Sequence, residues 1–215
     1  MKMLGGLHKT FERKIAILSD RASRLQSEAP SIDPVRVRYL TEGIISDLWQ
    51  SWTNFCRTII LESCLGSKSR SGQLIPPRMG DNSWQRIGYE AFCAVRGRSI
   101  HASKVNQFMR QEPTWGDVGR LITLIQVVRP VNSAMLLTAF GLPLLGPVHL
   151  QRTRNACFHK NADTLGDVRS LFIHYRIMNF SSPCDLAWQL DPTKSTLAIY
   201  AWMDDLEVMV DKATQ

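Results

Sequence analysis

The sequence predicts an all-α protein, a bundle of about six to eight helices with a looped insertion near its middle. Apolar residues recur at the 3.6-residue period of helices, and no segment alternates convincingly at the two-residue period of strands. The chain has 215 residues, of which 44% are hydrophobic and 21% charged, which is enough for one or at most two domains with a real core. We expect a single helical domain over residues 1–215, with residues 66–110 as a loop-rich insertion.

The N-terminal third of the chain predicts two long helices. The first covers Leu7–Glu28, where apolar residues share one face and charged residues occupy the other, and Pro30 ends it. The apolar residues are Phe11, Ile15, Leu18, Ala22 and Leu25. Asp33 followed by Pro34 is typical of an N-cap and a first helical residue, so a second helix is expected from there to Leu65.

Shorter helices are expected in the rest of the chain. The Gly-, Ser- and Pro-rich segment 66–82 predicts a loop, and the expected helices after it cover residues 84–95, 115–128, 132–140, 148–160, 165–177 and 196–212. The segment between Arg129 and Arg152 has no Lys, Arg, Asp or Glu. Its prolines and glycines leave about eleven helical residues, or ~16 Å, against a hydrocarbon core of ~30 Å. We therefore expect a buried core helix there and no membrane partner.

The five cysteines indicate the redox state of the protein. Their number is odd, and they form neither a C-x-x-C pair nor the Cys/His spacing of a zinc site, so we expect reduced, mostly buried thiols and no metal. The glycine-rich motifs that bind nucleotide phosphates are absent as well, and we expect no cofactor. The N-terminus reaches charged residues before any apolar run long enough for a signal peptide. These features predict a cytoplasmic protein.

The net charge of +7 is unevenly distributed along the chain. Residues 66–110 hold many basic residues but only two acidic ones, Asp81 and Glu90. Basic side chains on a loop can follow a phosphate backbone without reading its sequence, because they gain affinity from the release of counterions. A solvated loop kept soluble by its arginines is the alternative. The residues expected to bind phosphates in this insertion are Lys68, Arg70, Arg78, Arg96 and Arg98.

One arginine–histidine pair stands out among the five histidines. Three histidines follow an arginine by five residues: His101 after Arg96, His159 after Arg154, and His174 after Arg169. The bare spacing is a weak signal, but only Arg154 is followed directly by an asparagine, Asn155. Requiring that asparagine lowers the number of pairs expected by chance to about 0.01. The segment RNACFH is therefore the candidate catalytic motif.

The segment RNACFHKNADTLGDVRSL closely resembles the signature of the HEPN superfamily of all-α ribonucleases, in which an arginine, commonly followed by a polar residue, precedes a histidine by four to six positions. The resemblance extends more loosely to the tryptophan-rich helix around Trp49 and Trp52. Many such proteins place a polar residue of this helix, often a glutamate, against the motif, and this chain has Thr53 and Asn54 there. The resemblance implies a helical bundle that dimerises to juxtapose two motifs and cuts RNA without a metal ion.

The residue types of the motif suit that chemistry. A histidine that titrates near neutral pH can take a proton from a 2′-hydroxyl or give one to the leaving oxygen, and an arginine can hold the charge of the phosphorane. Asn155 can donate to a phosphate oxygen or orient His159. On an ideal helix five residues place Arg154 and His159 about 140° apart, so one helix makes a poor site by itself. A twofold axis could bring two such helices into one cleft.

We therefore expect a metal-independent endoribonuclease, with tRNA among its candidate substrates, that acts as a homodimeric toxin or anti-phage defence effector. Arg154, Asn155 and His159 are its expected catalytic residues, and Arg152 and Lys160 join the insertion in binding RNA. An antitoxin or another regulatory partner is expected to hold it in check. The alternative is an inert helical module that binds nucleic acid or a protein through residues 66–110. In that case Arg154 would cap a neighbouring helix and His159 would be a hydrogen-bonded residue near a helix end.

Overall fold

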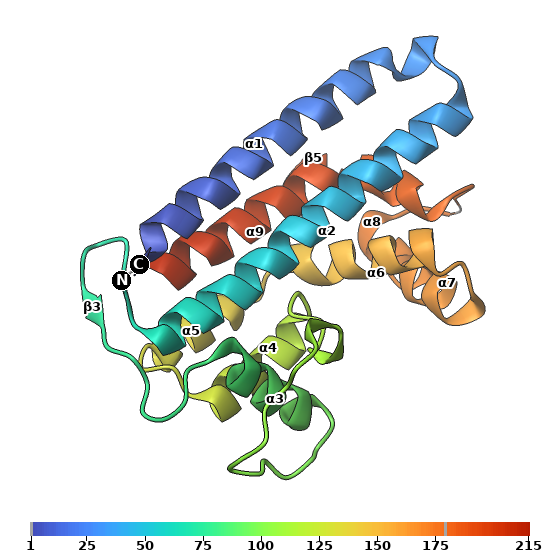
Figure 1. Ribbon diagram of the computed structural model, residues 1–215. Coiled ribbons are helices and arrows are strands. Elements are labelled where there is room, and N and C mark those ends of the chain that lie inside the picture. The colour runs from blue at the N-terminus through green and yellow to red at the C-terminus, as the bar shows by residue number, and fades with distance from the viewer. Residues whose placement is uncertain (1, 179) are drawn as a thin grey trace. The chain divides into compact units, whose positions relative to one another are not determined.

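The computed structural model describes residues 2–178 and 180–215. These residues form nine α-helices, with short 3-10 helices and two-residue strands between them (Figure 1), so the all-α class is confirmed. There is one helix more than the largest number expected, because the helix expected over 165–177 is two helices. The chain divides into two compact units. Unit 1 comprises Met1–Phe11, Trp52–Pro143 and Val208–Gln215, and unit 2 comprises Glu12–Ser51 and Leu144–Glu207. A single domain over residues 1–215 stays a prediction.

The three long helices are α1 (Leu4–Glu28), α2 (Pro34–Leu65) and α9 (Ala198–Thr214). The first two confirm the expected helices, and α9 confirms the one expected over 196–212 with a shift of two residues. Gly66 stops α2, since its φ of +88° is unfavourable for other residues and a Cβ there would lie 2.9 Å from the nitrogen of Pro77.

Unit 1 is built around an aromatic cluster. The rings of Phe11, Phe55 and Phe140 pack around Trp52, whose indole lies 5.9 Å from the ring of Phe140 between centroids. The shorter helices of this unit are α3 (Trp84–Val95), α4 (Val118–Val128) and α5 (Ser133–Phe140), and a 3-10 helix, η2, covers Met109–Gln111. Helix α3 begins and ends as expected. Helix α4 begins later than expected, because the side chain of Asp117 accepts from the backbone N–H of Arg120 and caps it.

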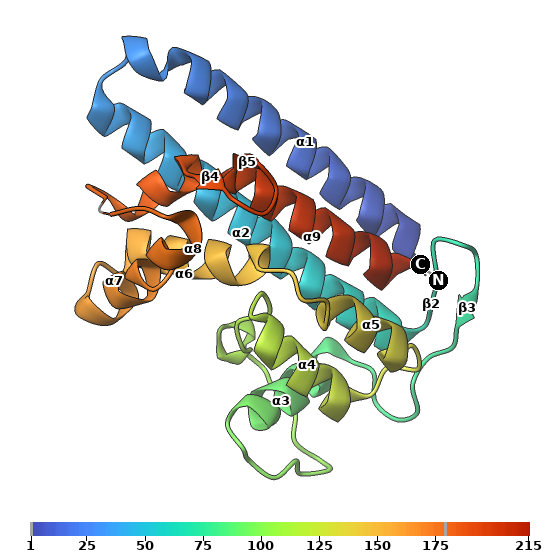
Figure 2. The same cartoon turned by 180° about the vertical axis from the view of Figure 1, so that it is seen from behind.

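Three two-residue strands join the ends of the chain in unit 1. Strand β1 (Lys2–Met3) pairs in parallel with β2 (Ser67–Lys68), which pairs antiparallel with β3 (Leu74–Ile75). The backbone N–H of Arg70 donates to the carbonyl of Thr214 at 2.7 Å, and Figure 2 shows β2 beside the end of α9. The segment 66–82 is thus a loop with two short strands. Their pairing depends on the far N-terminus, which a local pattern does not reveal.

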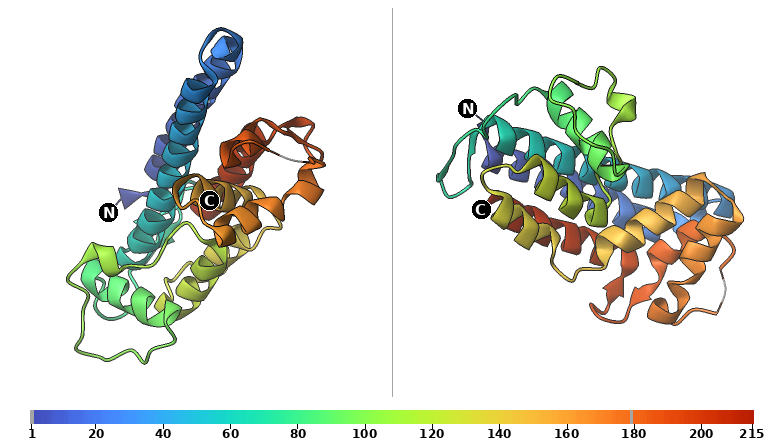
Figure 3. Two further views of the ribbon diagram at one scale, coloured as in Figure 1. Left: turned by 90° about the vertical axis from the view of Figure 1, so that its right-hand side faces the viewer. Right: turned by 90° about the horizontal axis from the view of Figure 1, so that it is seen from below.

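Unit 2 contains α6 (Gly146–Phe158), α7 (Ala162–Arg169) and α8 (Phe172–Tyr175). Helix α6 packs against α7 and against a 3-10 helix, η3, at Pro183–Trp188 (Figure 3). A hairpin of β4 (Leu190–Asp191) and β5 (Thr196–Leu197) precedes α9. Another 3-10 helix, η1, follows α1 at Ala29–Ser31.

Two further expectations concern the apolar segment and the cysteines. Helix α5 is buried through Leu136, Ala139 and Phe140, so the core helix expected between Arg129 and Arg152 is confirmed, although it has eight residues rather than about eleven. No helix within residues 2–178 and 180–215 is long and apolar enough to cross a membrane. All five cysteines are free and buried.

Candidate active site

The last turn of α6 holds the arginine and the asparagine of the motif. The guanidinium of Arg154 donates from Nη1 to Oδ1 of Asn155 at 3.3 Å and lies over the ring of Phe158, 5.0 Å from its centroid. Its Nε is buried and has no hydrogen-bond partner in the described part of the chain. Because the ring and the amide oxygen fix the guanidinium, its remaining donors point in a defined direction. No described carboxylate pairs with Arg154, and it remains a positioned, unneutralised cation.

His159 lies directly after the end of α6. Its backbone N–H donates to the carbonyl of Asn155 at 2.8 Å, and its own carbonyl accepts from Oγ1 of Thr164 at 2.8 Å. The side chain is exposed, and its imidazole makes no hydrogen bond or ion pair with the described residues. The backbone is therefore anchored on both sides while both ring nitrogens are open to a ligand.

The structure corrects the angle expected between the two motif residues. His159 is the C-cap of α6, with φ −120° and ψ 48°, so the ideal-helix separation of about 140° does not apply to it. The helix ends two residues earlier than expected because Asn161 starts α7 with a capping box, in which its side chain accepts from the backbone of Thr164. The turn between α6 and α7, rather than the helical period, directs the imidazole.

Two predicted RNA-binding cations flank the motif. Arg152 donates from Nη1 to Oγ of Ser170 at 2.9 Å, which leaves its charge without a carboxylate among the described residues. Lys160 places Nζ 3.6 Å from Oε1 of Glu42, a side chain that is only 16% exposed. The positive charge beside His159 is thus countered at Lys160 but not at Arg152.

Glu42 is a residue that the sequence reasoning missed. The resemblance placed Thr53 and Asn54 against the motif; both belong to unit 1 and the motif to unit 2, so that contact stays a prediction. Glu42 lies on the same helix about three turns earlier, so it shares the face of Thr53. That spacing was the available signal. In the structure the acidic residue that α2 brings to the motif is Glu42, through its contact with Lys160.

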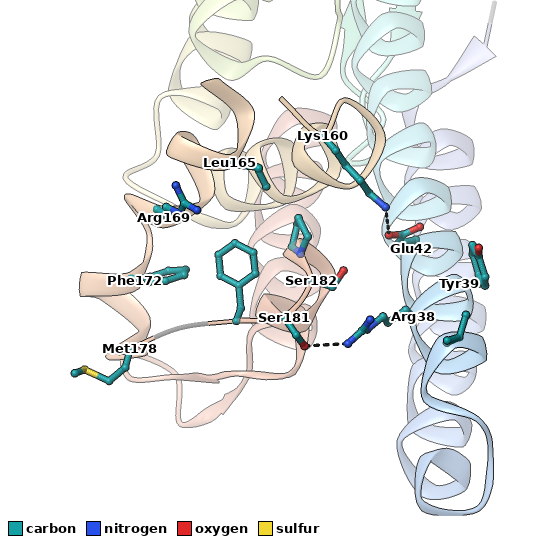
Figure 4. Close-up of a pocket in the computed structure, with 13 residues that line it drawn as sticks. Arg38, Tyr39, Glu42, Lys160, Leu165, Arg169, Phe172, Met178, Ser181 and Ser182 are labelled. Carbon is teal, nitrogen blue, oxygen red and sulfur yellow. Dashed lines mark hydrogen bonds and ion pairs between the residues drawn. The ribbon is translucent and has the colours of Figure 1, made fainter. Parts of the chain in front are cut away.

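A cleft of about 800 Å³ opens beside the motif within unit 2. Figure 4 shows α2 on one side, with Arg38, Tyr39 and Glu42, and α7 and α8 on the other, with Arg169 and Phe172. Its wall is completed by Lys160, Leu165, Met178 and residues 180–183. We call it the α2–α7 cleft. It combines cationic and aromatic side chains, and it was not foreseen from the sequence because its walls are more than a hundred residues apart in the chain.

The other two arginine–histidine pairs lie in different surroundings. His174 places Nε2 3.2 Å from Oδ2 of Asp191, and its ring centroid lies 4.9 Å from that of His149. Burial lowers the pKa of His149 to about 4, and its Nδ1 bonds the hydroxyl of Tyr175 at 2.8 Å. His101 is exposed outside any helix, as expected, and its ring bonds a neighbouring serine. Among the three histidines of these pairs, only His159 has an imidazole without a described partner.

Within unit 1, two predicted phosphate-binding cations are engaged by the protein itself. The guanidinium of Arg78 is only 10% exposed and donates to Glu90 at 2.6 Å and to the carbonyl of Val128 at 2.7 Å. Arg70 pairs with Asp211 at 2.5 Å. These contacts engage donors that a phosphate would use, so the buried Arg78 serves the fold rather than an RNA surface.

The other three predicted cations of the insertion are exposed. Lys68, Arg96 and Arg98 make no ion pair with the described residues. The guanidinium groups of Arg96 and Arg98 lie over the ring of Phe92, at 4.6 Å and 5.5 Å from its centroid. Their planes rest on an aromatic face while their charges remain in water. This arrangement suits binding to a flexible polyanion.

Comparisons of the chain with protein-family models, with curated proteins and with solved structures found no match. In the described part of the chain no group of three or more His, Cys, Asp or Glu side chains could hold a metal ion. The hydrogen bond to Cys184, together with burial, raises the pKa of the Cys157 thiol within the motif. A thiolate nucleophile at Cys157 is therefore unfavourable.

Proposed function

We propose that the protein is a metal-independent endoribonuclease whose active site lies at the end of α6. The observation that carries the proposal is the pairing of Arg154, held in place by Asn155 and Phe158, with an exposed His159 imidazole whose backbone is anchored on both sides. Among the described residues, no carboxylate pairs with Arg154 and no group bonds the His159 imidazole. Fixed cationic donors beside a free imidazole are the functional groups that metal-free RNA cleavage needs.

In the proposed reaction the 2′-hydroxyl oxygen of the RNA attacks the adjacent phosphorus. His159 takes the hydroxyl proton, or delivers a proton to the departing 5′-oxygen, while the guanidinium of Arg154 stabilises the charge on the phosphorane oxygens. The side-chain amide of Asn155 donates to a further phosphate oxygen, because its Oδ1 already accepts from Arg154. The bond from phosphorus to the 2′-oxygen forms and the bond to the 5′-oxygen breaks. The products carry a 2′,3′-cyclic phosphate and a 5′-hydroxyl.

A homodimer is part of the proposal. One imidazole cannot take the hydroxyl proton and protonate the leaving oxygen at the same moment, whereas two copies of the motif supply one base and one acid. Helix α6 offers partly exposed apolar residues for such a contact, with Val148 37% and Phe158 48% exposed. Light scattering at micromolar concentration is expected to give twice the mass of the chain. A monomer under the conditions of cleavage would contradict this part.

The test is cleavage of total tRNA by the purified protein in EDTA. His159→Ala is expected to lower the cleavage rate by about 10²- to 10⁴-fold, the usual size of a proton-transfer contribution, without a change in thermal unfolding. His101→Ala, an exposed histidine outside the motif, is the matched control and keeps the parental rate. The proposed role as a toxin predicts that expression stops growth and that His159→Ala relieves the arrest. If His159→Ala cuts as fast as the parent, the catalytic residues lie outside the motif, and if the parent protein cuts no RNA, the inert binding module replaces the nuclease.

A further inference from the structure

One residue that lines the α2–α7 cleft is the sequence neighbour of the proposed catalytic histidine. Lys160, which lines the cleft, directly follows His159, so their Cα atoms are about 3.8 Å apart. The cleft is open to solvent at its rim, where Tyr39 is 70% and Met178 is 94% exposed. Lys160 thus joins the wall of the cleft to the residue proposed to act on RNA.

Two arginines of the cleft, Arg169 and Arg38, form no ion pair with a described carboxylate. The guanidinium of Arg169 makes no hydrogen bond or ion pair within residues 2–178 and 180–215, and Figure 4 shows it on the wall formed by α7. Arg38, on the opposite wall, donates from Nη2 to Oγ of Ser181 at 3.0 Å. Glu42 faces Lys160 at 3.6 Å, so an anion is favoured near Arg169 rather than near Lys160.

An aromatic pair stands beside this cation. The rings of Phe172 and Phe180 meet edge to face, with centroids 5.0 Å apart, and both are only partly buried. Part of each ring is left for another flat group. An arginine that binds a phosphate oxygen and an adjacent aromatic face that stacks on a base are together the two halves of nucleotide recognition.

We propose that the α2–α7 cleft holds one unstacked nucleotide of a single-stranded RNA, with its base against Phe172 and its phosphate on Arg169. The inference rests on the proposed function, because the nucleotide held is the one next to the bond cut at His159. The space of about 800 Å³ accommodates a nucleotide rather than a helix. Bases in an RNA duplex are stacked and paired and do not enter such a space, so the cleft selects unpaired regions of the RNA.

The experiment measures binding by fluorescence anisotropy, with His159→Ala protein so that no RNA is cut. A labelled single-stranded oligonucleotide is expected to bind at least ten times more tightly than its duplex. Phe172→Ala lowers the affinity for the single strand by about 5- to 100-fold, the range of base stacking on aromatic residues. Phe172→Tyr keeps the ring and restores the affinity, and thermal unfolding confirms that each variant is folded.

A second strand, which lacks bases at successive positions, separates the two roles. Arg169→Gln lowers affinity about ten-fold for both the normal and the abasic strand, because it removes a phosphate contact. Phe172→Ala lowers the affinity for the normal strand but not for the abasic strand. The matched control is Arg13→Gln, which removes an exposed cation of α1 outside the cleft and changes the affinity for neither strand. If Arg169→Gln and Phe172→Ala bind as tightly as the parent, the cleft does not hold the RNA.

A free nucleotide offers the same chemistry, and competition distinguishes the two sources. Adenosine and uridine monophosphates are expected to displace the oligonucleotide only at concentrations far above its own. Displacement at equal concentration would overturn the RNA assignment in favour of a free nucleotide. Because binding is measured without cleavage, these results are independent of the nuclease test. Cleavage by His159→Ala at the parental rate would remove the proposed active site, whereas unchanged affinity in the cleft variants would remove only this inference.

Discussion

The insertion and the end of α6 differ in how the protein engages their arginines. The insertion is the most basic part of the chain, yet Arg78 and Arg70 are bound to Glu90 and Asp211. The end of α6 has fewer cations, yet Arg154 has no described carboxylate partner. Charge counted along a sequence thus differs from charge available to a ligand. The difference depends on which carboxylates the fold brings within about 4 Å of each cation.

The largest expected effect is on kcat, which depends on the end of α6 and not on the insertion. Arg154→Ala is expected to lower kcat by about 10²- to 10³-fold, since it removes charge stabilisation in the transition state. Arg96→Ala in the insertion leaves kcat unchanged and raises KM less than about ten-fold, since it removes only a contact that holds the RNA. Steady-state cleavage of a fluorescent RNA measures both. Equal losses of kcat in the two variants would move the active site toward the insertion.

A stability experiment tests whether the buried Arg78 stabilises the fold while the exposed Arg98 of the same insertion does not. Arg78→Ala is expected to lower the free energy of unfolding by about 2–4 kcal/mol, because it leaves the buried carboxylate of Glu90 with Arg86 alone. Arg98→Ala, which removes an exposed guanidinium, stays within about 0.5 kcal/mol of the parent. Urea unfolding at neutral pH gives both values. Similar values for the two variants would show that Arg78 is not structural.

The pH dependence of stability tests the buried histidine of α6. The pKa of His149 is about 4 when folded, because of burial and then of His174, against about 6.5 when unfolded. Its stabilising contribution is complete above pH 6.5 and is lost as the pH falls toward 4, since the unfolded chain then binds the proton more tightly. We expect a loss of about 2–3 kcal/mol over that range.

The control for this measurement is His149→Gln, which keeps an acceptor for the hydroxyl of Tyr175 but does not titrate. That hydroxyl accepts from Nε1 of Trp202 at 2.8 Å, so its proton is directed to Nδ1 of His149. Urea unfolding at pH 7 and pH 4.5 is expected to show a smaller difference in the variant than in the parent. An equal difference in both proteins would assign the pH dependence to other groups.

The smallest expected effect concerns the exposed cations of the insertion. Changing Lys68, Arg96 and Arg98 together to Ser is expected to flatten the slope of log Kd against log salt by up to about 2, since each phosphate contact to a single strand contributes ~0.7. The same experiment with Arg78→Gln leaves the slope unchanged. The unfolding temperature of the triple variant stays near that of the parent. A slope that does not change would leave the insertion as a solvated loop.

Local sequence patterns predicted the helices well because their signals are local. The Asp33–Pro34 start of α2, and α3, which begins at Trp84 and ends at Val95, agree with the structure. The expected helix over 165–177 did not form as one piece, because the backbone leaves the helix between Arg169 and Phe172. Its apolar periodicity continues through that break. A pattern of side chains therefore did not reveal where the backbone turns.

The sequence by itself determined the helical class, the buried free thiols and the RNACFH motif, since each depends on residues within a few turns of one another. The tertiary structure decided which cations are neutralised and that Glu42 contacts Lys160. It also decided that the α2–α7 cleft exists beside His159. These features join segments far apart in the chain, and a contact between distant segments leaves no periodic signal in either of them. The physical reason is that packing, rather than local propensity, fixes the distances between charges.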